Sequence, residues 1–213
     1  GLESDSPYES SKRVMDLLAL TSKLPSTQRI SAPFFDSSKT ITVKKGSSKV
    51  NEPSLEPEMY VTHPGIFASD IMPLPGILVV IYTWIFYFVR WIGSPWHPIT
   101  PYKAAVSPVW IALTGTEELN AAEGGGLKKS KWGSATDTSG NERVMKTEVP
   151  GWGWNGDVED TAEIKNRKGR KRDAVDLTKE KREEFEIIGA KAWEKIEEMR
   201  REWEDVLGVN SGK

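Results

Sequence analysis

Cysteine is absent from the 213 residues of this sequence, and histidine occurs only twice. The absence of cysteine excludes disulfide bonds, thiolate nucleophiles and cysteine-ligated zinc. His63 and His97 alone make a poor set of metal ligands. The sequence therefore argues against thiol and metal chemistry, and it fits the cytosol or the cytosolic face of a membrane.

A strong charge of either sign is also missing, because 29 basic and 31 acidic side chains give a formal net charge of −2. Such a balance provides no whole-chain attraction for nucleic acid, and the sequence contains no nucleic-acid-binding motif. We therefore expect no nucleic-acid partner. With 38% hydrophobic and 28% charged residues, the composition is typical of one sizeable folded domain or two small ones.

Several functional motifs are lacking as well. The sequence has no G-x-S-x-G elbow, and the carboxylates of residues 157–205 alternate with opposite charges as on a solvated helix. Residues 151–156 match G-x-G-x-x-G by letter, but the pattern predicts no strand before them and no helix after them. Two tryptophans would also crowd a pyrophosphate there. We therefore reject hydrolase chemistry and a nucleotide loop at this position.

The features that are present begin with a helix. Ser6 and Pro7 are typical of a helix N-cap and first turn. Apolar residues follow at helical spacing, and Pro25 predicts the end of the helix. Residues 26–57 are rich in serine, lysine and proline, and we expect an irregular insertion. Residues 59–62 then predict a short strand, which ends in a sharp turn.

The segment 71–92 is the most apolar part of the chain, with no charged residue between positions 71 and 89. Its apolar side chains surround the whole helix, and Pro73, Pro75 and Gly76 shorten the unbroken run below the length of a bilayer span. We expect a membrane-associated helix, either interfacial or re-entrant. A true span, a buried helix and a dimer face remain the alternatives.

The remainder divides into two parts. Residues 120–172 are rich in glycine and tryptophan, and we expect an irregular segment that ends in a basic run at 165–172. This run reads as a solvated linker more readily than as a patch for an anionic membrane. Residues 173–208 predict an amphipathic helix, capped at its start by Thr178 or Asp176 and closed by Gly208. Residues 1–119 would form the body.

Tyr8 and Lys12 lie one turn apart on the first predicted helix. An ammonium beside a phenol favours the phenolate, which suits tyrosine as a general acid in carbonyl reduction. The spacing alone is also compatible with an ordinary surface pair.

The order of motifs resembles the short-chain dehydrogenase/reductase family. The Tyr8 and Lys12 helix is followed by a strand closing in Pro64-Gly65, with Ser69 four residues later. The resemblance implies an α/β fold, here the C-terminal half of a Rossmann-like domain with an incomplete sheet. It also implies that Tyr8 and Lys12 are catalytic and bind the cofactor, and that His63, Pro64, Gly65 and Ser69 border the cofactor.

Within that family, the tryptophan-bearing stretches at 93–103, 131–134 and 151–154 are similar to the fungal 3-ketosteroid reductases of ergosterol synthesis. This narrower resemblance implies NADPH as cofactor and a sterol 3-ketone as substrate, reduced to the 3β-hydroxysterol. It further implies the cytosolic face of the endoplasmic reticulum membrane or a lipid droplet. Other enzymes of sterol C4 demethylation would be partners there.

Two family features are not found. The glycine-rich nucleotide loop and the catalytic serine belong upstream of the tyrosine helix, yet seven residues precede Tyr8, and the chain does not begin with methionine. We expect a fragment that neither holds NADPH tightly nor turns over alone. The alternative is a membrane-associated scaffold, in which residues 71–92 anchor the protein and residues 178–207 recruit partners.

Overall fold

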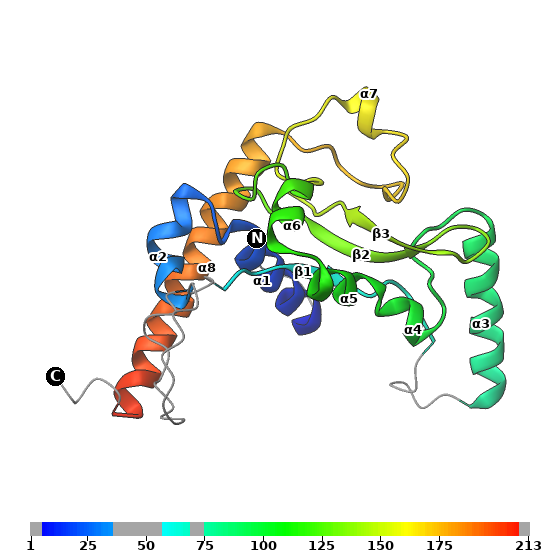
Figure 1. Cartoon of the computed structure of the whole chain (residues 1–213), viewed down its shortest axis with the longest axis horizontal. Helices are drawn as coiled ribbons and strands as arrows, with labels where there is room; N and C mark the ends of the chain where they lie inside the picture. Colours follow the sequence, from blue (N-terminus) through cyan, green and yellow to red (C-terminus); the bar gives the residue numbers. More distant parts are fainter. Residues whose placement is uncertain (1–5, 36–56, 69–74, 209–213) are drawn as a thin grey trace.

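The computed structural model describes residues 6–35, 57–68 and 75–208 (Figure 1). In chain order its elements are α1 (Pro7–Thr21), α2 (Pro25–Phe35), β1 (Val61–His63), α3 (Gly76–Trp91), α4 (Pro101–Ala104), α5 (Val106–Leu113), α6 (Thr116–Ala122), β2 (Lys131–Thr136), β3 (Glu142–Thr147), α7 (Thr161–Ile164) and α8 (Lys179–Val206). The described part of the chain is therefore α/β, as predicted.

The sheet has three strands in the order β1-β2-β3. β1 runs parallel to β2, with Val61 opposite Lys131 and His63 opposite Gly133. β3 pairs antiparallel with β2, so the sheet is mixed. A parallel pair joined by helices is compatible with part of a Rossmann-like domain, but that assignment stays a prediction.

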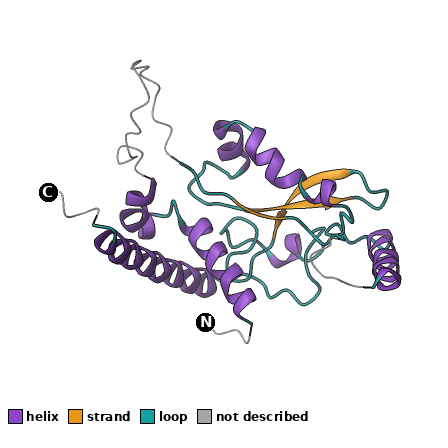
Figure 2. Cartoon of the chain, turned by 90° about the horizontal axis from the view of Figure 1, so that it is seen from below, coloured by secondary structure: helices purple, strands orange, loops and turns teal. Residues whose placement is uncertain are grey.

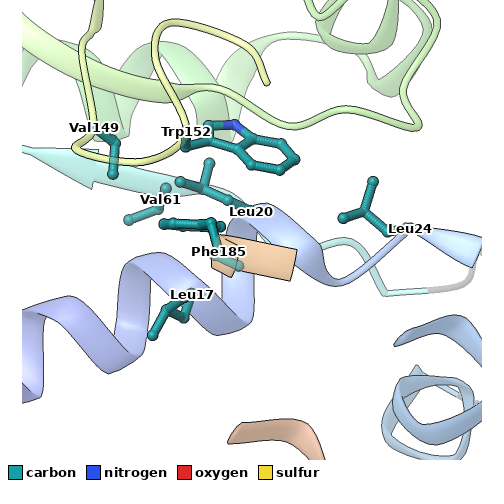
Figure 3. Close-up of a cluster of buried hydrophobic side chains, with 8 residues drawn as sticks. Leu17, Leu20, Leu24, Val61, Val149, Trp152 and Phe185 are labelled. Carbon is teal, nitrogen blue, oxygen red and sulfur yellow. The ribbon is translucent and has the colours of Figure 1, made fainter. Parts of the chain in front are cut away.

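The core joins segments that are far apart in the sequence (Figure 3). Leu17 and Leu20 of α1 and Leu24 just after it form one buried cluster. The other members of this cluster include Val61 of β1, Val149, Trp152 and Phe185. Trp152 is fully buried, and its indole Nε1 donates to the carbonyl of Lys129 at 2.9 Å. Trp152 is itself a residue of the G-x-G-x-x-G stretch at 151–156, and a Cβ at Gly156 would lie 2.6 Å from its indole. The stretch is a packed turn, which agrees with our rejection of a nucleotide loop.

The prediction of an irregular segment at 26–57 is wrong for its first part. Pro25 begins α2 instead of merely ending α1, which stops at Thr21. Phe34 and Phe35 place their rings edge-on against Trp193, with centroids 5.3 and 5.9 Å away. Packing against a distant helix therefore stabilises a segment whose composition favours loop. Residues 36–56 lie outside the described part.

The prediction of an irregular segment at 120–172 is also wrong in part, because residues 131–147 form the β2–β3 hairpin and residues 161–164 form the short helix α7. The inner positions of β2 are small or polar and give no alternating apolar pattern. Ser134 is fully buried because its hydroxyl donates to the carbonyl of Ala104 at 2.6 Å and accepts from the amide of Ser107 at 2.9 Å. Tertiary hydrogen bonds replace the apolar contacts of an ordinary inner strand.

The two long helices, α8 and α3, differ in how far their side chains are buried. α8 has 28 residues; the Thr178 hydroxyl accepts from the amide of Lys181 at its start, and Gly208 follows its last turn with φ +69. Both predicted helix boundaries are thereby confirmed. α3 has 16 residues and none of them is buried. Among the residues described, no helix combines the length and the apolar character needed to cross a bilayer.

Candidate active site

Tyr8 and Lys12 lie in the first turns of α1, as the sequence predicts. The Lys12 ammonium lies over the face of the Tyr8 ring, 4.2 Å from its centroid. This is a cation–π contact, so the two side chains are held together on one side of the helix. Tyr8 is 66% exposed, which leaves it accessible to a reacting group.

The remainder of α1 is fixed to the sheet. Lys131, at the start of β2, donates to both carboxylate oxygens of Asp16 at 2.8 Å. Directly after Asp16, Leu17 enters the core, and Leu20 does so one turn later; both are fully buried. The helix that carries Tyr8 and Lys12 is therefore held against the parallel strand pair, and its first turns have a defined position relative to the end of β1.

The turn after β1 needs its glycine. Gly65 has φ +74, and a Cβ there would lie 2.7 Å from Pro98 Cδ and 2.9 Å from the carbonyl oxygen of Ser134. Both the positive φ and the close approach exclude larger residues without a shift. The Gly65 amide also donates to Nδ1 of His63 at 2.8 Å. His63, Pro64 and Gly65 thus form one ordered turn, while the predicted site residue Ser69 lies outside the described part of the chain.

His63 is neutral in the folded protein. Burial is the largest cause that lowers its pKa, the positive charges of Lys131, Lys12 and Lys171 follow in that order, and together they bring the pKa to about 4. Since Nδ1 accepts from an amide, the ring proton lies on Nε2. The ring packs against Trp96 with centroids 4.9 Å apart. His63 is consequently a fixed, uncharged donor at the C-terminal end of β1.

The structure brings the end of β1 and the first turns of α1 into one electrostatic neighbourhood, because Lys12 acts on His63. Sequence reasoning missed three further members. Trp96 supports the imidazole, Lys131 ties the sheet to α1, and Lys171 adds a third positive charge. The basic run at 165–172 was the only signal for Lys171, and nothing local links it to α1.

The chemistry of this group suits an anionic ligand and not a metal. The charges of three ammonium groups act on a neutral imidazole, and Lys131 is already paired with Asp16. Cationic donors bind phosphate or carboxylate groups. Within the described ranges, no cluster of three or more His, Asp or Glu side chains could hold a metal ion. The site therefore fits a phosphate-bearing cofactor.

A second polar cluster has a structural role. Lys129 is almost fully buried and forms ion pairs with Glu58 at 2.8 Å and Glu123 at 3.1 Å. Burial alone would raise the pKa of Glu58, but hydrogen bonds from Lys129 and Tyr60 outweigh it and lower the value. The Tyr60 pKa is raised by burial and by Glu58. Glu123 also accepts from the amide of Ser130 at 3.1 Å, so the cluster fixes the start of β1 to the start of β2.

Comparison with known proteins gives a consistent set of relatives. The chain is 43% identical, over 98% of its length, to a 3-keto-steroid reductase of Gibberella zeae, and 41% identical, over 97%, to one of Aspergillus fumigatus. A 3-keto-steroid reductase of Saccharomyces cerevisiae is 30% identical over 70% of the chain.

The chain matches only part of the length of each relative. The chain spans 44% of the Gibberella protein, 46% of the Aspergillus protein and 34% of the Saccharomyces protein. No family model matches the chain, and no solved structure matches it. Identity above 40% over almost the whole chain nevertheless shows common descent with these proteins. The chain is therefore homologous to part of the fungal 3-keto-steroid reductases.

Proposed function

We propose that this chain carries the catalytic tyrosine part of an NADPH-dependent reductase, which converts a sterol 3-ketone to the 3β-hydroxysterol in ergosterol synthesis. The observation that carries the proposal is the identity of 41–43% to proteins named 3-keto-steroid reductases over nearly all of the chain. The geometry supports it, because the Lys12 ammonium lies over the Tyr8 ring and its charge acts on His63 in the ordered His63-Pro64-Gly65 turn.

In this mechanism Tyr8 donates its phenolic proton to the oxygen of the sterol 3-ketone as negative charge develops there. Lys12 stabilises the phenolate that remains, since its ammonium is held against the same ring. NADPH, when bound, supplies the hydride. The exposed position of Tyr8 leaves its hydroxyl free to meet a bulky, flat substrate.

The residues that would hold the cofactor are Lys12, His63, Pro64, Gly65 and Ser69. Lys12 is cationic and its charge acts on His63 at the end of β1, and His63 presents Nε2–H from a part-buried, neutral ring. Beyond the carboxyl end of a parallel strand is the usual position of ligands in α/β sheets. The tight Gly65 turn allows a ligand to approach the backbone without a side chain in the way.

We further propose that α3 lies in the interface of the endoplasmic reticulum membrane or a lipid droplet, on its cytosolic side. Its exposed side chains include Ile77, Trp84 and Trp91, each at least 70% accessible. Arg90 near its end can remain among headgroups while the tryptophans occupy the interface. A substrate dissolved in the membrane, as a sterol is, would reach the protein at this surface. Other enzymes of sterol C4 demethylation would act on the same membrane.

The decisive experiment assays the longest protein that the gene encodes, with NADPH and a 3-keto sterol. Tyr8→Phe should reduce turnover by about 10²–10⁴-fold, the usual contribution of general acid catalysis. Tyr102→Phe is the matched control, because Tyr102 is an exposed tyrosine of α4 and lies outside the site. Undiminished turnover by Tyr8→Phe would remove Tyr8 from catalysis and favour the scaffold interpretation.

The isolated chain provides a second measurement. We propose that it binds NADPH weakly, since the glycine-rich loop of short-chain reductases is not found in it. Fluorescence titration with NADPH measures this directly, and tight binding by the 213-residue chain would contradict the expectation.

A further inference from the structure

The basic run at 165–172 has two kinds of member. Arg170 forms ion pairs with Glu148 and Asp176, and Arg167 pairs with Glu159 at 2.7 Å. These arginines connect the segment to neighbouring loops and so shape it. In the described part of the chain, Lys171 forms no salt bridge, and its side chain is exposed. The run is therefore a loop that ion pairs hold in place and that exposes particular cations. It is not a uniform solvated linker.

Gly169 determines where the loop lies. Its carbonyl accepts from the indole Nε1 of Trp96 at 2.8 Å. It has φ +90, and a Cβ would lie 2.8 Å from the Trp96 ring, so the loop rests directly on that ring. The Trp96 ring also packs against the His63 imidazole, with centroids 4.9 Å apart. One tryptophan thus connects the loop to the end of β1.

Lys171 follows Gly169 by two residues in the same loop. Its positive charge acts on His63 together with those of Lys12 and Lys131. Lys131 is neutralised by Asp16 at 2.8 Å, whereas Lys12 and Lys171 have no carboxylate partner in the described ranges. Two unneutralised ammonium groups from distant segments therefore act on one neutral ring. Like charges placed together disfavour each other unless an anion joins them.

We propose that Lys171 and Lys12 form an anion-binding site at the C-terminal end of β1 that takes a phosphate group of the nicotinamide dinucleotide. This inference rests on the proposed function for the identity of the ligand. Lysine suits the task because its ammonium is a compact charge that can approach a phosphate from several directions. The loop at 165–172 then completes the cofactor site from a part of the chain far from the tyrosine helix.

The test compares three variants of the longest protein that the gene encodes. Lys171→Ala should weaken NADPH binding by about tenfold, the usual effect of losing one charge-assisted hydrogen bond, and Lys171→Arg should keep most of it. Lys168→Ala is the matched control, since it removes the same charge from the same loop. Equal NADPH affinities for Lys171→Ala and the wild type would overturn the proposal.

A probe that does not depend on catalysis separates this inference from the proposed function. Inorganic pyrophosphate, added during an NMR titration of His63, should raise the histidine pKa in the wild type and much less in Lys171→Ala. Such a result in a protein that binds no NADPH would keep the anion site and remove the proposed cofactor. If Lys171→Ala lost binding to anionic vesicles but responded to pyrophosphate as the wild type does, the loop would be a membrane contact and the proposal would fail.

Discussion

Helices α3 and α8 lie at opposite ends of the molecule and reverse the usual relation between composition and burial (Figures 1 and 2). α3 is apolar on all sides and has no buried residue. α8 is rich in charge, yet it buries Phe185, Gly189, Trp193 and Glu197 against the body. The amount of apolar surface in a helix did not decide which one joined the core.

The difference lies in the pattern. α8 carries its apolar residues in a stripe, so one face packs on α1 and α2 while the other stays hydrated. α3 has no polar face, and one of its contacts with the body is that of Phe86 with His97, whose ring centroids are 5.6 Å apart. A helix with apolar residues on every side needs an apolar environment on every side, and this protein provides one on a single side only.

The largest expected effect is the loss of the α8 anchor. Trp193 is 1% exposed and donates from Nε1 to the carbonyl of Leu18 at 3.2 Å. Trp193→Ala should reduce the free energy of unfolding by about 3–5 kcal/mol. Trp84→Ala on α3 should change it by less than about 0.5 kcal/mol, because that ring is 72% exposed. Urea denaturation of both variants measures the contrast, and comparable losses would show that α3 is packed.

Acid should destabilise the protein through His63. Its pKa is about 4 in the folded state against 6.5 ordinarily, so the unfolded chain binds more protons between these values. Stability is therefore complete above pH 6.5 and falls as the pH drops toward 4, by up to about 3 kcal/mol.

Urea denaturation at pH 7.5 and pH 5 measures this slope for the wild type and His63→Gln. The variant should lose most of the slope between these pH values. A remainder is expected from His97, whose pKa burial also lowers. An unchanged slope in His63→Gln would contradict a neutral, buried imidazole.

The crossing of α8 over α1 depends on Gly189. A Cβ there would lie 2.6 Å from Cγ2 of Thr21. The Thr21 side chain is held in place because its hydroxyl donates a hydrogen bond to the carbonyl of Leu17. Gly189→Ala should cost about 1–2 kcal/mol, because overpacking outweighs the helix propensity gained. Gly76→Ala at the start of α3 is the control, since nothing lies within 4 Å of that position. If both variants were equally stable by urea denaturation, the close crossing would be refuted.

The smallest effect on stability is expected on the outer face of α3, where the effect on membrane binding should be large. Ile81→Glu with Trp84→Glu should leave the free energy of unfolding within about 0.5 kcal/mol of the wild type. The pair should abolish flotation with phosphatidylcholine vesicles, because both side chains are exposed. Met199→Glu with Trp203→Glu on α8 is the matched control and should float as the wild type does. Equal loss in both pairs would remove the special role of α3.

Much of the fold follows from local signals. The N-terminal helix, the turn at Gly65 and both boundaries of α8 were predictable because caps, prolines and an apolar stripe act within a few residues. α2 was not predictable, since Pro25 and Pro33 favour a break and the compensating contact with Trp193 is distant. The β2–β3 hairpin was not predicted for a similar reason. The polar Ser134 can be buried there only because tertiary hydrogen bonds satisfy its hydroxyl.

The candidate site also contains residues that local sequence signals identify and residues that only the tertiary structure identifies. Tyr8, Lys12 and Gly65 were identifiable because their spacing and turn chemistry are local. Lys171 was visible only as one cation in a basic run, and its role depends on the indole of Trp96, which joins Gly169 to His63. No property of the run itself distinguishes Lys171 from Lys168.

By itself, the sequence determined the absence of thiol chemistry, the balanced charge, the tyrosine helix and the amphipathic C-terminal helix, since each depends on residue identity or on contacts within a few positions. Only the tertiary structure decided that Lys12, His63 and Lys171 share one neighbourhood and that the most apolar helix stays outside the core. The physical reason is that burial and the summed field of distant charges depend on how the chain packs, and short-range preferences do not specify that packing.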